Sequence, residues 1–96
     1  MYTSIRHYDG VTDTGEVVRN IKEGFLPRIR QVRGFVNYSV IEAGDTLITI
    51  STFEDRSGAE ESNNTAAEWI RQANLGSLIP NRPQVTAGEV AVHESR

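Results

Sequence analysis

Two side chains within residues 57–74 have the types and positions to contact a bound small molecule. Asn63 lies four residues after Ala59 and seven before Ile70, so a helix over this segment would turn its amide toward the apolar side. A buried amide must be hydrogen-bonded to protein, water or ligand. Trp69, the only tryptophan, lies on the flank of the same face, where its indole could stack on a flat ligand. The small side chains around Asn63 leave volume, so the pattern predicts a ligand pocket between this helix and a sheet.

A structural role is the alternative for both residues, and it is the commoner one for buried polar groups. Asn63 could bond to a loop carbonyl within a tightly packed, alanine-rich helix. Trp69 could simply fill a small core. The sequence leaves both alternatives open.

Three further side chains are pocket candidates because of their position in the expected strands. Arg6 and His7 lie on the first strand, and Tyr38 lies on the second. An imidazole titrates near neutral pH, so His7 could act as an acid or base, with a barrel-facing or surface position as the alternative. Tyr38 could face the pocket or a dimer interface, where tyrosine is enriched. The other histidine, His93, is expected at the opposite end of the paired strands, too far from His7 to share a metal.

Composition excludes several classes of function. The 96 residues carry a net charge of −3, whereas binding to nucleic acid or to an anionic membrane requires a basic surface. There is no cysteine, which excludes disulfides, thiolate zinc sites and cysteine nucleophiles. The N-terminus is too polar for a signal peptide and no run approaches a membrane span, so we expect a cytoplasmic protein. We expect neither a metal nor another cofactor.

The order of elements predicts one α+β domain over residues 1–96. Apolar periodicity and turn residues place strands at 2–8, 35–42, 46–53 and 84–93, and helices at 14–33 and 57–74. Two βαβ-like halves joined by a hairpin form a split βαβ, the ferredoxin-like plan (β-α-β-β-α-β). Right-handed crossovers then give the spatial order fourth, first, third, second, an antiparallel sheet with both helices on one face.

Local signals set the expected ends of the two helices. Asp13 with Glu16 forms a capping box for the first helix, and Gly34 occupies the position of a left-handed C-cap. Pro27 lies inside this helix and should kink it or remove a bond near Glu23. For the second helix, either Ser57 (with Glu60) or Asp55 is the expected cap.

The two central strands carry apolar residues on both faces. In strand 46–53, Leu47 and Phe53 point one way and Ile48 and Ile50 the other. Strict alternation in strand 35–42 places Phe35 and Ile41 on one face, and Val36, Tyr38 and Val40 on the other. Two helices cover only one face of the sheet, and large exposed apolar patches are unusual in monomers. We therefore expect a homodimer built through the open sheet face. Where the first and fourth strands pair, we expect His7 beside Gly88 or Glu89.

The chain resembles the dimeric α/β-barrel superfamily, in particular its antibiotic biosynthesis monooxygenase-like group. The resemblance covers nearly the whole chain through the order of elements, with local echoes at Gly24-Phe25-Leu26-Pro27, Arg33-Gly34-Phe35, Phe53-Glu54-Asp55-Arg56 and Ala59-Glu60-Glu61-Ser62. It implies two sheets packed face to face and a pocket between helices and sheet in each subunit. Functions in that superfamily include cofactor-free oxidation of polycyclic phenols, haem degradation and small-molecule isomerisation.

The resemblance is uneven among the branches of this group. Asn63 and Trp69 on the second helix resemble the pattern of the cofactor-free monooxygenases, which also use a basic residue from the last strand, whereas 84–93 contains no Arg or Lys. The haem-degrading branch has a histidine ligand on or just after the second helix, and 57–83 contains none. Two hypotheses follow. The first is monooxygenase-like chemistry on a planar aromatic substrate without a cofactor. The alternative is a non-catalytic module that binds a small hydrophobic ligand or only assembles.

Overall fold

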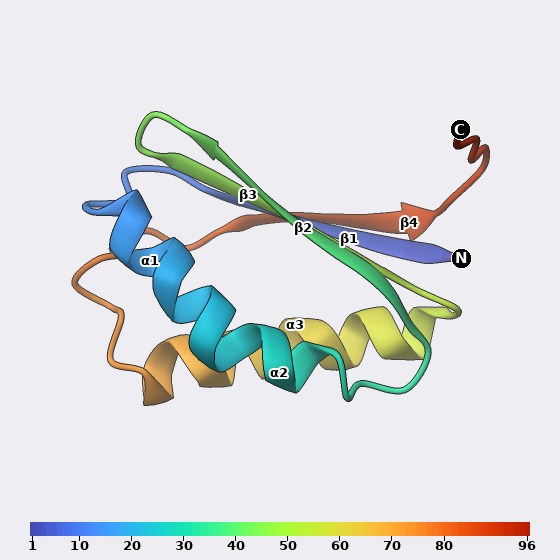
Figure 1. Cartoon of the computed structure of the whole chain (residues 1–96), viewed down its shortest axis with the longest axis horizontal. Helices are drawn as coiled ribbons and strands as arrows, with labels where there is room; N and C mark the ends of the chain where they lie inside the picture. Colours follow the sequence, from blue (N-terminus) through green and yellow to red (C-terminus); the bar gives the residue numbers. More distant parts are fainter.

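A computed structural model describes residues 1–96 as one four-stranded antiparallel sheet with its helices on one face (Figure 1). The elements, in chain order, are β1 (Tyr2–Tyr8), α1 (Thr14–Asn20), η1 (Ile21–Phe25), α2 (Leu26–Ile29), β2 (Phe35–Ala43), β3 (Thr46–Phe53), α3 (Arg56–Gln72) and β4 (Gln84–Glu89). The strands lie in the order β2-β3-β1-β4. This confirms the predicted α+β class, the ferredoxin-like plan and the spatial order of the strands.

The first helical segment is interrupted by a π-helical turn, η1, between α1 and α2. Pro27 has no N–H and its ring crowds the preceding turn. The N–H of Leu26 donates to the carbonyl of Ile21, five residues back, which widens the helix just before the proline. The disturbance expected from Pro27 is therefore present as a π turn. The expected helix over 14–33 was too long, because α2 ends at Ile29 and turns follow as far as Gly34, whose φ is 83°.

A bulge in β2 changes the facing of its first residues. The register shifts between Phe35 and Asn37, so that Phe35 pairs with Phe53 and Asn37 with Thr52. The extra residue, Val36, breaks the strict alternation. Phe35 therefore faces the helices, with its ring 6.0 Å from that of Phe53. The sequence-based assignment of Phe35 to the same face as Ile41 was wrong for this reason.

The last strand is shorter than predicted and differs in register. β4 ends at Glu89, which pairs with Tyr2 at the start of β1, and His7 pairs with Gln84 instead of Gly88 or Glu89. After Glu89, one backbone bond joins the N–H of Val90 to the carbonyl of Met1. Strand β1 offers no partner beyond that point, so the remaining residues leave the sheet (Figure 1).

Helix α3 begins with an aspartate cap. The Asp55 carboxylate accepts from the N–H of Gly58 at 3.2 Å and from the hydroxyl of Ser57 at 2.6 Å. The Ser57 hydroxyl, followed by the Gly58 N–H, holds the pKa of Asp55 below its ordinary value, because both donors favour the ionised form. Of the two predicted caps, Asp55 is the one that the structure uses.

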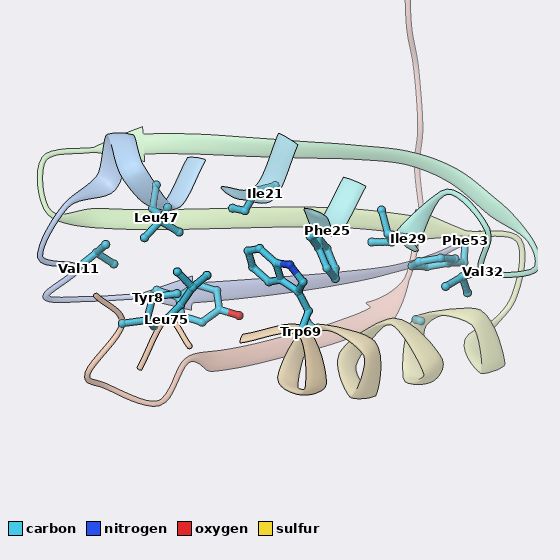
Figure 2. Packing of buried hydrophobic residues seen from close by; sticks show 14 residues of the cluster. Tyr8, Val11, Ile21, Phe25, Ile29, Val32, Leu47, Phe53, Trp69 and Leu75 are labelled. Carbon is cyan, nitrogen blue, oxygen red and sulfur yellow. The ribbon is translucent and has the colours of Figure 1, made fainter. Parts of the chain in front are cut away.

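The core lies between the helix layer and one face of the sheet (Figure 2). Phe25 and Ile29 approach from the first helical segment and Trp69 from α3. Leu47 and Phe53 project toward them from β3 and are almost completely buried. We call this covered surface of the sheet the inner face, and the opposite, helix-free surface the outer face.

Candidate functional site

A small cavity lies inside the layer between helices and sheet. Its volume is about 20 Å³, which is room for about one water molecule. Apolar side chains from η1, β3 and α3 form most of its wall. The polar groups on the wall are few: Arg6, Tyr8, Tyr38, Thr49, Ser51 and Ser62. A mainly apolar cavity with a few convergent polar groups has the character of a ligand site.

Arg6 supplies a buried positive charge to this wall. Only 8% of the residue is exposed, because even-numbered residues of β1 face the helices. Its Nε donates to the hydroxyl of Tyr8 at 2.8 Å, and its Nη1 donates to the amide oxygen of Asn63 at 3.0 Å. Both partners are neutral, and none of the four ion pairs in the structure involves Arg6. A buried charge without a counter-charge is costly, so a guanidinium held in this way is suited to an anionic partner.

Asn63 joins helix α3 to the central strand β1. Its amide oxygen accepts from the hydroxyl of Ser4 at 2.9 Å as well as from Arg6. An arginine can only donate hydrogen bonds, which fixes the amide oxygen toward the strand. Asn63 does turn toward the sheet, but it contacts the polar groups of β1 and does not line the cavity. It positions Arg6.

Two phenol groups accompany Arg6. The Tyr8 hydroxyl already accepts from Arg6, and the structure gives its own proton no side-chain acceptor, so this proton is available to a ligand. The guanidinium also lies 5.6 Å from the centre of the Tyr8 ring, a cation–π distance. Burial, followed by the nearby Tyr8, raises the pKa of Tyr38 above its ordinary value, while Thr49 and Arg6 act in the opposite direction. Tyr38 is therefore a neutral donor under ordinary conditions.

Trp69 is the largest of the side chains that α3 contributes to the wall. Its ring centre lies 5.3 Å from that of Phe25, and Figure 2 shows the indole between Phe25 and the residues of the sheet. A side chain on Gly24 would place its Cβ only 2.8 Å from the indole Nε1. The absence of a side chain at Gly24 thus allows the indole to lie against the π turn.

The five residues predicted as pocket candidates separate into two groups. Arg6, Tyr38 and Trp69 line the cavity, and Asn63 holds Arg6. His7 lies on the outer face, and its Nε2 is 3.0 Å from the Asp9 carboxylate. Alternation along β1 turns neighbouring side chains to opposite faces, so Arg6 and His7 cannot share one site.

Tyr8 and Ser4, which contact Arg6 and Asn63, were not among the predicted site residues. The signal was present, because Ser4, Arg6 and Tyr8 are alternate residues of one strand and must share a face. No three histidine, cysteine or acidic side chains are grouped so as to hold a metal ion. No helix has both the length and the apolar character needed to cross a membrane.

A second hollow lies outside the cavity, between η1 and the edge strand β2. Its volume is about 290 Å³. It is lined by Val18, Ile21, Lys22, Leu26, Tyr38, Val40 and Glu42. We call it the outer groove because it lies outside the cavity, although it is on the same, helix-covered side of the sheet.

No protein-family model and no curated protein matches the sequence. Solved structures match it in fold. The chain superposes on Rv0793 from Mycobacterium tuberculosis with a TM-score of 0.73 and 17% identity, covering 98% of each chain. The monooxygenase from the gene ActVA-Orf6 of Streptomyces coelicolor, in complex with Nanaomycin D, gives a TM-score of 0.71 and 18% identity, covering 98% of this chain and 92% of that one. SnoaB, a cofactor-independent oxygenase from Streptomyces nogalater, gives a TM-score of 0.71 and 9% identity, covering 96% and 94%.

Identities this low concern the arrangement of the backbone and carry no residue roles from one protein to another. The arrangement itself is matched over nearly the whole chain, by structures described as antibiotic biosynthesis monooxygenases and by others of unknown function. The chain therefore has the ferredoxin-like α+β fold of antibiotic biosynthesis monooxygenase-like domains.

Proposed function

We propose that the inner cavity binds a small planar aromatic molecule with an acidic oxygen, such as a polycyclic phenol or enol. The single observation that carries this proposal is the buried guanidinium of Arg6, whose partners are neutral. An ionised ligand oxygen would supply the missing negative charge. The Tyr8 hydroxyl can donate to the same oxygen, and the indole of Trp69 offers a flat apolar surface to the rings.

The chemistry that fits these groups is oxidation without a cofactor. No carboxylate or imidazole lines the cavity, so the ligand must lose its phenolic proton to solvent before or during binding. The positive charge of Arg6 favours this loss, since it stabilises the anion. An ionised phenol is electron-rich and can reduce dioxygen itself. If the ionised phenol activates a CH₂ group of its own ring system, dioxygen converts this CH₂ into a carbonyl group. One oxygen atom enters the carbonyl and the other leaves as water, so that CH₂ plus O₂ gives C=O plus H₂O.

A non-catalytic ligand-binding module is the alternative. The same cavity would then hold the anion without promoting oxygen attack. The absence of a proton-accepting side chain from the cavity wall favours this alternative over any reaction that needs general base catalysis.

We also propose that two copies pair through their outer faces. Isoleucines from three strands lie on this face: Ile5, Ile41, Ile48 and Ile50. Ile5 and Ile41 are 38% and 44% exposed in the single chain. A second copy would bury these side chains without disturbing the inner cavity, which lies on the opposite side of the sheet. The cytoplasmic location stays a prediction.

The proposed function is tested by ligand binding to Arg6→Met. We expect 1,8-dihydroxyanthraquinone to quench the fluorescence of Trp69, the only tryptophan. Loss of the charged donor should weaken its affinity roughly 10- to 100-fold. The matched control is Arg30→Met, an exposed arginine, which should bind as the unmodified protein does. Unchanged affinity in Arg6→Met, or no binding to the unmodified protein, would overturn the proposal.

Catalysis is decided with 1,8-dihydroxyanthrone, which carries an oxidisable CH₂. A monooxygenase should consume one O₂ per molecule oxidised to the quinone, faster than the uncatalysed reaction, and Arg6→Met should lose this acceleration. Binding of the quinone without any acceleration of oxygen uptake would establish the non-catalytic alternative.

A further inference from the structure

The inner cavity is too small for the ligand that its chemistry fits. A volume of about 20 Å³ admits about one water molecule, whereas a polycyclic phenol is many times larger. The adjacent outer groove has about 290 Å³. The two spaces share two wall residues, Ile21 and Tyr38. The cavity and the groove are thus neighbouring compartments separated by these side chains.

Of the two shared wall residues, Tyr38 is the one whose side chain is placed to change its conformation. It belongs to β2, which lies at the edge of the sheet and has a strand on one side only. The β-bulge at Val36 lies two residues before it, and the π turn η1 lies opposite, with the Phe25 ring 5.6 Å from that of Tyr38 in an edge-on contact. Tyr38 is paired with Ser51 on one side of its strand, but the bulge just before it and the π turn opposite it are the two irregular backbone segments next to the cavity.

The walls of the outer groove indicate what it would hold. Val18, Leu26 and Val40 make most of it apolar, and the charged residues that line it, Lys22 and Glu42, are exposed. A hydrocarbon group would gain from burial there, and its free end could reach solvent. The cation of the groove, Lys22, is exposed to solvent, unlike the buried guanidinium of Arg6.

We propose that the outer groove is the second half of the ligand site, joined to the inner cavity when the Tyr38 side chain turns outward. The ligand class is then an aromatic oxyanion that carries an apolar substituent. The anionic oxygen lies against Arg6, and the substituent lies between η1 and β2. This inference rests on the proposed function and adds the part of the ligand that Arg6 does not contact.

The affinity test compares 1,8-dihydroxyanthraquinone with its 3-butyl derivative. In the unmodified protein we expect the butyl group to strengthen binding about tenfold, below the ceiling set by burial of four carbons. Val40→Lys should abolish this advantage, so that the plain and the butylated quinone bind this variant with affinities within about twofold of each other. Val92→Lys is the matched control, since Val92 is 87% exposed in the C-terminal segment, and it should keep the full advantage. Val18→Lys, from the helical wall, repeats the test without altering β2.

The role of Tyr38 is tested by measuring the association and dissociation rate constants of the ligand. If it separates the two compartments, Tyr38→Ala should raise both the association and the dissociation rate constants about tenfold or more, whereas Tyr38→Phe keeps the ring and should leave both near their original values. A contact residue without a gating role would change mainly the dissociation rate constant.

The possible failures are separable. If the plain quinone does not bind the unmodified protein, the proposed function is wrong and this inference with it. If the plain quinone binds but the butyl group gives no advantage, or Val40→Lys and Val18→Lys both retain it, the outer groove is no part of the site. An association rate constant unchanged in Tyr38→Ala would overturn the role of Tyr38 as the partition.

Discussion

Each face of the sheet carries some side chains of the kind expected on the other. The inner face, covered by helices, contains Ser4, Arg6 and Ser51, all buried beside the apolar Leu47 and Phe53. The outer face, which no helix covers, presents isoleucines such as Ile5 and Ile41. An antiparallel sheet with one solvated face would show polar residues on that face and apolar ones beneath the helices.

Under the two proposals made above, each face is completed by a partner from outside the single chain. On the inner face, the unmatched charge of Arg6 calls for a negatively charged ligand. On the outer face, the isoleucines call for an apolar surface, which we assign to a second copy. Substitutions on the outer face should therefore change the oligomeric state, whereas substitutions on the inner face should change the stability of the single chain.

The largest effect is expected on the outer face. Ile50→Lys places an ammonium group at the centre of this face, beside Ile5. In a two-fold symmetric dimer it appears twice, and each unpaired buried charge costs several kcal/mol. We expect sedimentation to show a monomer at micromolar concentration for the variant and a dimer for the original. Gln31→Lys adds the same charge at an exposed position and should remain dimeric. A monomeric unmodified protein would contradict the assignment of the outer face.

A smaller effect is expected where the helices cover the inner face. Gly24→Ala brings a methyl group to 2.8 Å from Trp69 Nε1, and relieving such overpacking costs about 1–3 kcal/mol. The gain in helix propensity from Gly to Ala is about 1 kcal/mol, so the unfolding free energy should show a net loss of up to about 2 kcal/mol. Gly76→Ala meets no atom within 4 Å and should leave stability unchanged or slightly raised. Denaturant unfolding measures both. Stabilisation by Gly24→Ala would mean that the indole yields freely.

The smallest effect concerns the pH dependence of the inner face. Burial raises the pKa of Tyr38 in the folded chain, so above pH 10 the unfolded chain releases this proton first. The stability that Tyr38 contributes is therefore complete below that pH and is lost as pH rises. Between pH 9 and 11, the unfolding free energy of the original should fall by about 1 kcal/mol more than that of Tyr38→Phe. Parallel losses in the two proteins would show that Tyr38 is well hydrated.

Most of the fold was predictable because it rests on periodicity. The alternation along 46–53 correctly assigned Leu47 and Ile48 to opposite faces, and the short gap between the predicted strands 35–42 and 46–53 located the hairpin. The errors fall where one residue breaks a regular pattern. The bulge at Val36 depends on packing against β3, and no local residue pattern signals it.

The site was predictable only in part, since it depends on how two elements meet. The helical face of Asn63 could be determined from spacing, but its partner could not, because the depth of α3 against β1 fixes which strand residue it reaches. Arg6 was a candidate by position alone. The lack of a carboxylate near its guanidinium, which gives the residue its significance, is a property of the assembled layers.

The position of β1 in the sheet has a consequence for the growing chain. Strand β1 lies between β3 and β4 in the sheet, and both of these partners follow it in the chain. Its contacts span long stretches of sequence, and the hydroxyls of Thr3 and Thr52, 2.9 Å apart, are separated by 49 residues. During synthesis, β1 cannot complete its pairing with β3 until residue 53 has emerged. It cannot complete its pairing with β4 until residue 89 has emerged. The hairpin of β2 and β3, by contrast, contains only local contacts and can form as soon as its own residues have been synthesised. Strand β1 can then pair with the free edge of β3.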